Sequence, residues 1–72
     1  MYQIIHTSPI ETTANGNKLV FIEVIWSEFN KRFEAQLVDR KAGSMRLLKT
    51  FFLGESKWAI RWADVTAKTW ND

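Results

Sequence analysis

Apolar positions recur in five stretches of the chain, and four short turn sequences separate them. The turn sequences are ANGN at 14–17, FNKR at 29–32, KAGS at 41–44 and LGES at 53–56. A two-residue hairpin needs positive φ at both central positions, which Asn15 and Gly16 tolerate best. Residues 41–43 suit a three-residue hairpin that ends in a left-handed Gly, and Asn30 with Lys31 suits a two-residue turn. The pattern predicts an antiparallel meander with strands at about residues 2–13, 18–29, 32–40 and 44–53.

Pro9 interrupts the first of these strands. Proline has no N–H to donate to a strand ladder, so it is confined to edge strands and bulges. In a meander the first strand is an edge strand. The position of Pro9 therefore agrees with the predicted strand order.

The last segment carries two overlapping periodicities. Strand-like alternation joins Trp58, Ile60 and Trp62, whereas alanines recur every four residues at positions 59, 63 and 67. One helical stripe collects more residues than the alternation does, namely Trp58, Trp62, Val65, Thr66, Thr69 and Trp70. We expect a helix at about residues 57–70, capped by Ser56, with its tryptophans on the sheet. The alternative is a fifth strand that closes a small five-stranded β-barrel.

The strand pairing predicts two sheet faces of different character. If Asn30 and Lys31 form the turn, one face carries Val20, Ile22, Val24, Trp26, Phe33, Ala35 and Leu37, and a loop at 41–43 adds Met45, Leu47 and Phe51. We expect the helix on this face. The opposite face receives Phe21, Ile25, Phe29, Leu48 and Phe52, interleaved with Arg32, Glu34, Gln36, Arg40 and Arg46. One helix cannot cover both faces, so we expect a partner on the second.

Under two alternative interpretations, the second face needs no partner. Scattered surface hydrophobic residues are normal, because more than half of a protein surface is apolar. A one-residue register error near Gly43 would also move Leu48 and Phe52 into the core.

The composition indicates an ordinary soluble globular domain that spans residues 1–72. The chain is 46% hydrophobic and 25% charged, has a formal net charge of +2 and contains no cysteine. A reducing cytoplasm is compatible with this cysteine usage. The N-terminus lacks a basic region and a long apolar run, so we expect no signal peptide and no membrane partner.

Residues able to carry chemistry are few. His6 is the only histidine, and the three glycines are isolated. A metal site or a hydrolytic triad would need further ligands or an ordered nucleophile, and a phosphate loop would need clustered glycines. We expect no enzyme activity, no cofactor, no bound metal and no small-molecule substrate.

The sequence leaves two functional hypotheses. The first is an α+β interaction module, self-associating or docking on a protein as small inhibitors and adaptors of phages and mobile elements do, through its uncovered face or by β-augmentation at an edge strand. The residues expected to bind are Phe21, Ile25, Phe29, Arg32, Arg46, Leu48 and Phe52. The alternative is a single-stranded nucleic-acid-binding module that stacks bases on aromatic residues. Its cations would be Arg32, Arg40, Arg46, Lys49, Lys57 and Arg61.

Overall fold

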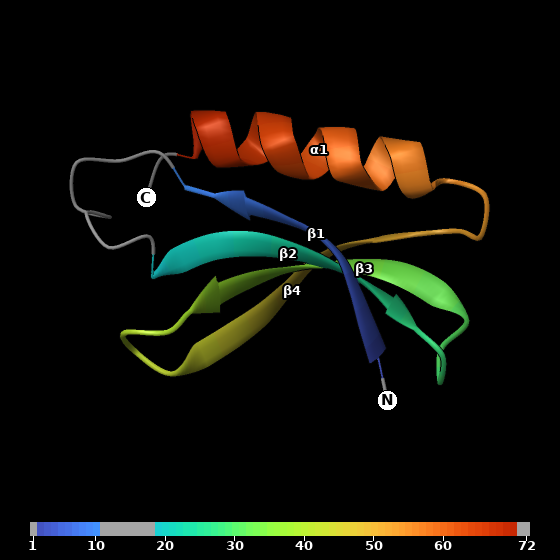
Figure 1. Cartoon of the computed structure of the whole chain (residues 1–72), viewed down its shortest axis with the longest axis horizontal. Helices are drawn as coiled ribbons and strands as arrows, with labels where there is room; N and C mark the ends of the chain where they lie inside the picture. The colour runs from blue at the N-terminus through green and yellow to red at the C-terminus, as the bar shows by residue number, and fades with distance from the viewer. Residues whose placement is uncertain (1, 11–18, 71–72) are drawn as a thin grey trace.

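The computed structural model of the chain describes residues 2–10 and 19–70, which form one antiparallel sheet and one helix (Figure 1). The elements are β1 Tyr2–Pro9, β2 Val20–Ser27, β3 Arg32–Asp39, β4 Ser44–Phe51 and α1 Ser56–Thr69. Neighbouring strands pair in the order β1-β2-β3-β4, and the sheet stays open. The predicted α+β meander with a C-terminal helix on one face is confirmed, and the five-stranded barrel is wrong. The predicted hairpin at Asn15 and Gly16 lies outside the described residues.

The turn between β2 and β3 is longer than predicted. It spans residues 28–31, so that Ser27 pairs with Arg32. Lys31 adopts a positive φ of 54° and its N–H donates to the Ser27 carbonyl at 2.7 Å. The two extra residues shift the register by two, so Val24 faces Ala35. An even shift leaves every side chain on its predicted face.

The turn between β3 and β4 spans residues 40–43, one more than predicted. Gly43 has the left-handed conformation expected of it, with φ at 70°. The Ala42 N–H donates to Oδ1 of Asp39 at 3.0 Å, which holds the start of the loop.

A β-bulge changes the faces of β4. The register shifts between Ala35 and Gln36, and Leu48 is the unpaired extra residue. Leu48 packs against the core under the helix. Before the bulge, Arg46 lies opposite Leu37 and faces the helix side, whereas Met45 and Leu47 face away from it. The predicted faces of these four β4 residues are therefore wrong.

The core lies between α1 and one face of the sheet. On the sheet side Ile22, Val24 and Ala35 are fully buried. On the helix side the buried residues are Ala59, Ala63 and Ala67. Small helix residues opposite bulky sheet residues let the two layers approach closely and fill the space between them.

The tryptophans flank this contact instead of filling it. Trp62 and Trp70 are half-buried against the core, and the Trp62 ring meets the Phe51 ring edge-on at 6.0 Å. Trp58 is exposed, so its predicted core position is wrong. Ser56 is the first helical residue and Glu55 is the cap, without a side-chain capping hydrogen bond. The predicted Ser56 cap is therefore wrong as well.

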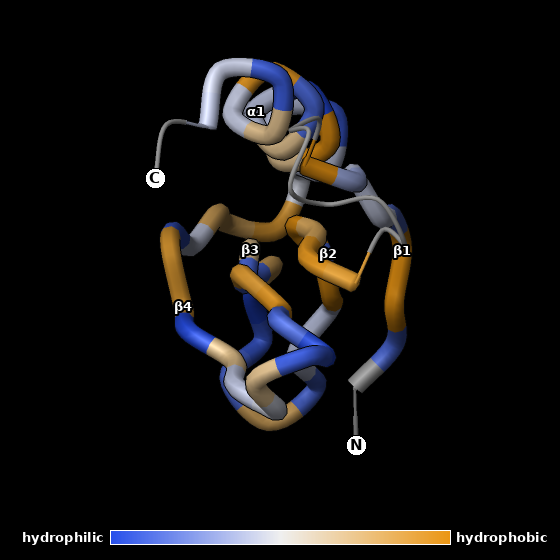
Figure 2. Tube along the Cα trace, turned by 90° about the vertical axis from the view of Figure 1, so that its left-hand side faces the viewer, coloured by the Kyte–Doolittle hydropathy of each residue, from blue (hydrophilic) through white to orange (hydrophobic). Residues whose placement is uncertain are grey.

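The second sheet face, called here the helix-free face, buries its central residues although the one described helix lies on the other face. Figure 2 shows α1 above the sheet and β1 and β4 at its two sides. Phe21 and Ile25 point away from the helix and are nevertheless buried. Their cross-strand neighbours on β1 and β3 flank both residues, and the Arg40 guanidinium lies 5.4 Å from the centre of the Phe21 ring. The expectation that they stay uncovered is wrong.

Candidate functional site

Four large apolar side chains project into water at one end of the molecule. The exposed fractions are 91% for Phe29, 80% for Phe52, 75% for Leu53 and 66% for Trp58. Phe29 belongs to the β2–β3 turn, Phe52 and Leu53 to the β4–α1 loop, and Trp58 to the first turn of α1. Figure 1 shows both connections at the same end of the molecule. We call these four residues the terminal apolar surface.

A tight turn after β4 presents two of these residues. Phe51 ends β4 and enters the core, so Phe52 points outward. The Glu55 N–H donates to the Phe52 carbonyl at 3.0 Å, and Gly54 has a φ of 94°. This geometry is that of a turn that requires a positive φ at its third residue, where glycine is the least strained choice. Glu55 Oε1 also accepts the Phe52 N–H at 2.7 Å, which fixes the loop.

A shallow hollow of about 250 Å³ lies beside the terminal apolar surface. It is lined by Lys57, Trp58 and Arg61 of α1. Neither cation forms an ion pair with any residue that the structure describes. The Trp58 indole thus lies beside two cationic side chains without a described ion-pair partner. This arrangement suits a ligand in which an anionic group is attached to a flat ring.

The helix-free face consists of rows that cross all four strands. The first row is Pro9, Phe21, Val38 and Met45; the second is Thr7, Glu23, Gln36 and Leu47; the third is Ile4, Ile25, Glu34 and Thr50. The exposed apolar members stand at the edges, on β1 and β4. The central residues of the first and third rows are largely buried, and the exposed apolar residues of the face lie at its rim.

Glu23 is the one buried carboxylate of this face among the described residues. It is 5% exposed, and its Oε1 has no hydrogen-bond partner in the part of the chain that the structure describes. Burial raises the pKa of Glu23, and the Arg40 cation partly offsets that rise. The same Arg40 guanidinium lies 5.4 Å from the centre of the Phe21 ring, which belongs to the neighbouring row.

A polar cluster joins β1 to α1. His6 Nε2 lies 2.7 Å from Oδ1 of Asp64, and the Ser8 hydroxyl donates to the same oxygen at 2.6 Å. These hydrogen bonds, that of His6 first, lower the pKa of Asp64. The Ser8 hydroxyl and His6 both contact Asp64, so this carboxylate is the centre of the cluster. The cluster fastens the helix to the edge strand, and a hollow of about 220 Å³ lined in part by Ser8, Asp64 and Lys68 lies beside it.

The apolar residues predicted to bind a partner are divided among three places. Phe21 and Ile25 are buried in the helix-free face, and Leu48 packs against the core. Phe29 and Phe52 are exposed at the terminal apolar surface. Sequence reasoning missed Leu53 and Trp58 there. The alanine repeat on α1 was the signal that could have placed Trp58 away from the sheet.

The predicted cations are also dispersed. Arg32 lies on the helix-free face and its Nε is 2.8 Å from Glu34 Oε2. Arg40 covers Phe21, and Arg46 and Lys49 lie along β4 on the helix side. Lys57 and Arg61 stand on α1 beside the hollow. No single patch brings these six residues together.

Comparison of the chain with protein-family models, with curated proteins and with solved structures gave no match. Within residues 2–10 and 19–70, His, Asp and Glu side chains nowhere form a group of three that could hold a metal ion. The described helix is too short and too polar to cross a membrane.

Proposed function

We propose that the chain is a non-catalytic interaction module that binds a protein partner through the terminal apolar surface. The observation that carries this proposal is that Phe29, Phe52, Leu53 and Trp58 are each two-thirds or more exposed at one end of the molecule. The chain has the size of small inhibitors and adaptors. Its lack of cysteine suits a reducing compartment such as the cytoplasm.

Energetics support a bound partner at this surface. Full burial of a large apolar side chain stabilises a complex by roughly 1.5–3 kcal/mol. Aromatic residues that project into a partner's pockets are the commonest anchors of protein interfaces. Three of the four residues here are aromatic, and the turn at Gly54 holds two of the four in a fixed position. A fixed loop loses less entropy on binding than a mobile one.

Site-specific photo-crosslinking tests the proposal. Benzoylphenylalanine in place of Phe52 should give a discrete protein adduct in lysate of the native host, and Phe29→Ser with Trp58→Ser should remove it. Val65 is an exposed apolar residue of α1 outside this surface and provides the matched control position. Equal adducts at positions 52 and 65, or none at position 52, contradict the proposal. If the adduct contains a second copy of the chain, the surface mediates self-association and does not bind a different protein.

A second candidate function rests on the hollow formed by Lys57, Trp58 and Arg61. Single-stranded nucleic acids bind where bases stack on exposed aromatic rings and cations contact phosphates. Lys57→Ala with Arg61→Ala should abolish a mobility shift of single-stranded oligonucleotides at low salt. Lys68→Ala on the same helix is the control. If the wild-type chain causes no shift, this candidate is excluded.

A further inference from the structure

The outer edge of β4 is a long strand edge without a described partner. β4 ends the strand order, and each of its residues except Leu48 and Phe51 is exposed. A free edge presents a row of N–H and C=O groups that another extended chain can pair with. Figure 2 shows β4 at the side of the molecule, apart from α1.

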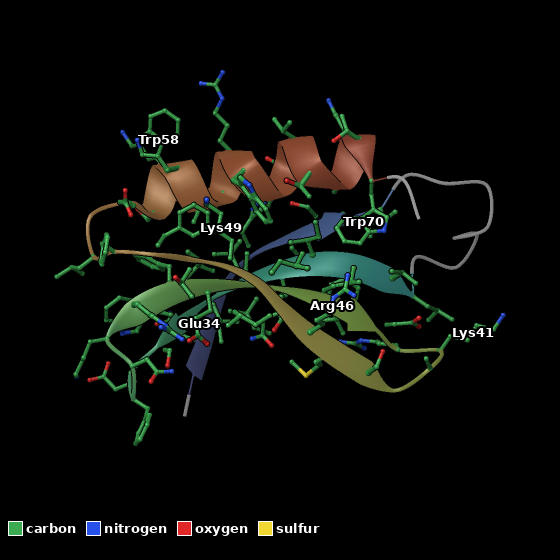
Figure 3. The ribbon with its side chains drawn as sticks, turned by 180° about the vertical axis from the view of Figure 1, so that it is seen from behind. Glu34, Lys41, Arg46, Lys49, Trp58 and Trp70 are labelled. Carbon is green, nitrogen blue, oxygen red and sulfur yellow. The ribbon has the colours of Figure 1, made fainter. Side chains whose placement is uncertain are left out.

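Positive charge follows this edge, with Arg46 and Lys49 on the helix side. Lys41, Arg46 and Lys49 are spread along β4 and the turn before it (Figure 3). Residues 40–51 contain no acidic residue. Ion pairs among the described residues involve none of the three cations. The only neighbouring ring contact is that of Lys49 Nζ, 5.7 Å from the centre of the Phe51 ring.

The opposite side of the same edge is apolar. Met45 and Leu47 lie on the helix-free face and are about half exposed. Strand alternation places Met45 and Leu47 on one side and Arg46 on the other, and the bulge at Leu48 brings Lys49 to the same side as Arg46. An added strand would therefore meet cations with one set of its alternating side chains and apolar residues with the other set.

A second copy of the chain does not fit this edge. Two β4 strands that paired antiparallel would place Arg46 and Lys49 of one copy near those of the other, with no acidic residue to separate them. Like charges on paired strands destabilise the pair. A strand with acidic side chains gains from the same arrangement.

We propose that β4 is the docking edge for an extended segment of a protein partner in which acidic residues alternate with apolar ones. The segment adds a fifth strand beside β4, with its carboxylates toward Lys41, Arg46 and Lys49 and its apolar side chains beside Met45 and Leu47. This inference rests on the proposed function in that the partner is a protein, but it uses a different surface.

Fluorescence anisotropy with synthetic peptides tests the inference. The probe is a labelled peptide of about eight residues that alternates Glu with Val or Ile, and the reference replaces each Glu by Lys. The wild-type chain should bind the Glu peptide at least about tenfold more tightly at low salt than at about 0.5 M salt, and should not bind the Lys peptide. Arg46→Glu with Lys49→Glu should reverse this preference.

Backbone pairing is tested without changing the protein. N-methylation of alternate residues removes the N–H groups along one edge of the probe. One of the two methylation patterns should abolish binding, because its methyl groups face β4, and the other should leave the affinity within about twofold. Equal effects of both patterns, or equal binding of the Glu and Lys peptides, overturn the inference.

Two controls separate this inference from the proposed function. Phe29→Ser with Phe52→Ser should leave the affinity for the Glu peptide unchanged, because neither residue belongs to β4. If these variants abolish peptide binding, the peptide occupies the terminal apolar surface and the β4 inference is wrong. Sedimentation that shows a dimer abolished by Arg46→Glu would also overturn it, since the edge would then be occupied by a second copy.

Discussion

The two edge strands of the sheet differ in the features that govern pairing with a further strand. β1 ends in Pro9, carries a bulge between Ile4 and His6, and is fastened to α1 through Asp64. β4 contains no proline and is largely exposed; it carries a bulge of its own at Leu48, and Arg46 and Lys49, which form no ion pair among the described residues, lie on its helix side. Proline, bulges and covering elements are the devices by which proteins block sheet edges. β1 therefore combines a proline, a bulge and a link to α1, whereas β4 combines a bulge with a largely exposed edge.

The fastening of the helix explains part of this asymmetry. The hydrogen bonds of His6 and Ser8 to Asp64 hold α1 toward β1. β4 meets α1 at the C-terminal end of the strand, where Phe51 contacts Trp62, while the first half of the strand, which carries Arg46, diverges from the helix (Figure 3). A helix fixed to one edge leaves the other accessible.

The largest difference between the two edges should appear in stability. Ile10 follows β1 and is buried in the core, whereas Leu47 of β4 is half exposed. Ile10→Ala should lower the free energy of unfolding by about 2–4 kcal/mol, because it leaves a cavity. Leu47→Ala should cost less than about 1 kcal/mol. Urea denaturation measures both, and equal losses would contradict the view that the chain at the end of β1 is held in the core while the exposed side of β4 is not.

Glu23 lies in the second row of the helix-free face, and replacing its carboxylate by an amide should stabilise the chain. Its raised pKa means that the folded state holds the proton more tightly than the unfolded state. The resulting stabilisation is present below the ordinary pKa of 4.5 and is lost as pH rises through the folded value. Glu23→Gln should remove this pH dependence and raise the free energy of unfolding at pH 7 by about 1 kcal/mol. A loss of stability at pH 7 would show that Oε1 has a partner.

Asp64 should have the opposite pH dependence and a smaller effect. Its lowered pKa contributes stability that is present above the ordinary value of 3.8 and is lost as pH falls through the folded value. Asp64→Asn should lower stability at pH 7 by about 0.5–1 kcal/mol, because the cluster is partly exposed. Lys49→Gln on the other edge is the control, with an expected change within about 0.5 kcal/mol. Equal effects of the two variants would remove the distinction between the edges.

The fold could be predicted because its signals are local. Turn residues such as Gly43 and the edge position of Pro9 depend on backbone conformation, which a few neighbouring residues decide. The alanine repeat at 59, 63 and 67 was also visible in the sequence. The repeat marks the side of the helix that faces the sheet. The prediction gave that side to the tryptophans because they are more hydrophobic, but they are too large for the contact between the helix and the sheet.

The candidate surfaces could not be predicted because they depend on single-residue shifts and on twist. Nothing in the stretch SMRLLKTF marks Leu48 as a bulge, yet the bulge decides which side Arg46 and Leu47 face. The burial of Phe21 and Ile25 involves neighbours on β1 and β3 that are distant in the sequence. Phe29 and Phe52 were named correctly as uncovered residues, although they lie in loops instead of on the sheet face.

Amide hydrogen exchange along β1 and β4 tests the open-edge account most directly. In the free chain, alternate amides of β4 should exchange rapidly because their N–H groups point away from β3. The alternating Glu peptide should slow these β4 amides at least about tenfold and leave the β1 amides unchanged. If the β4 amides are already protected in the free monomer, or if the peptide protects β1 or α1 instead, β4 is not an open docking edge.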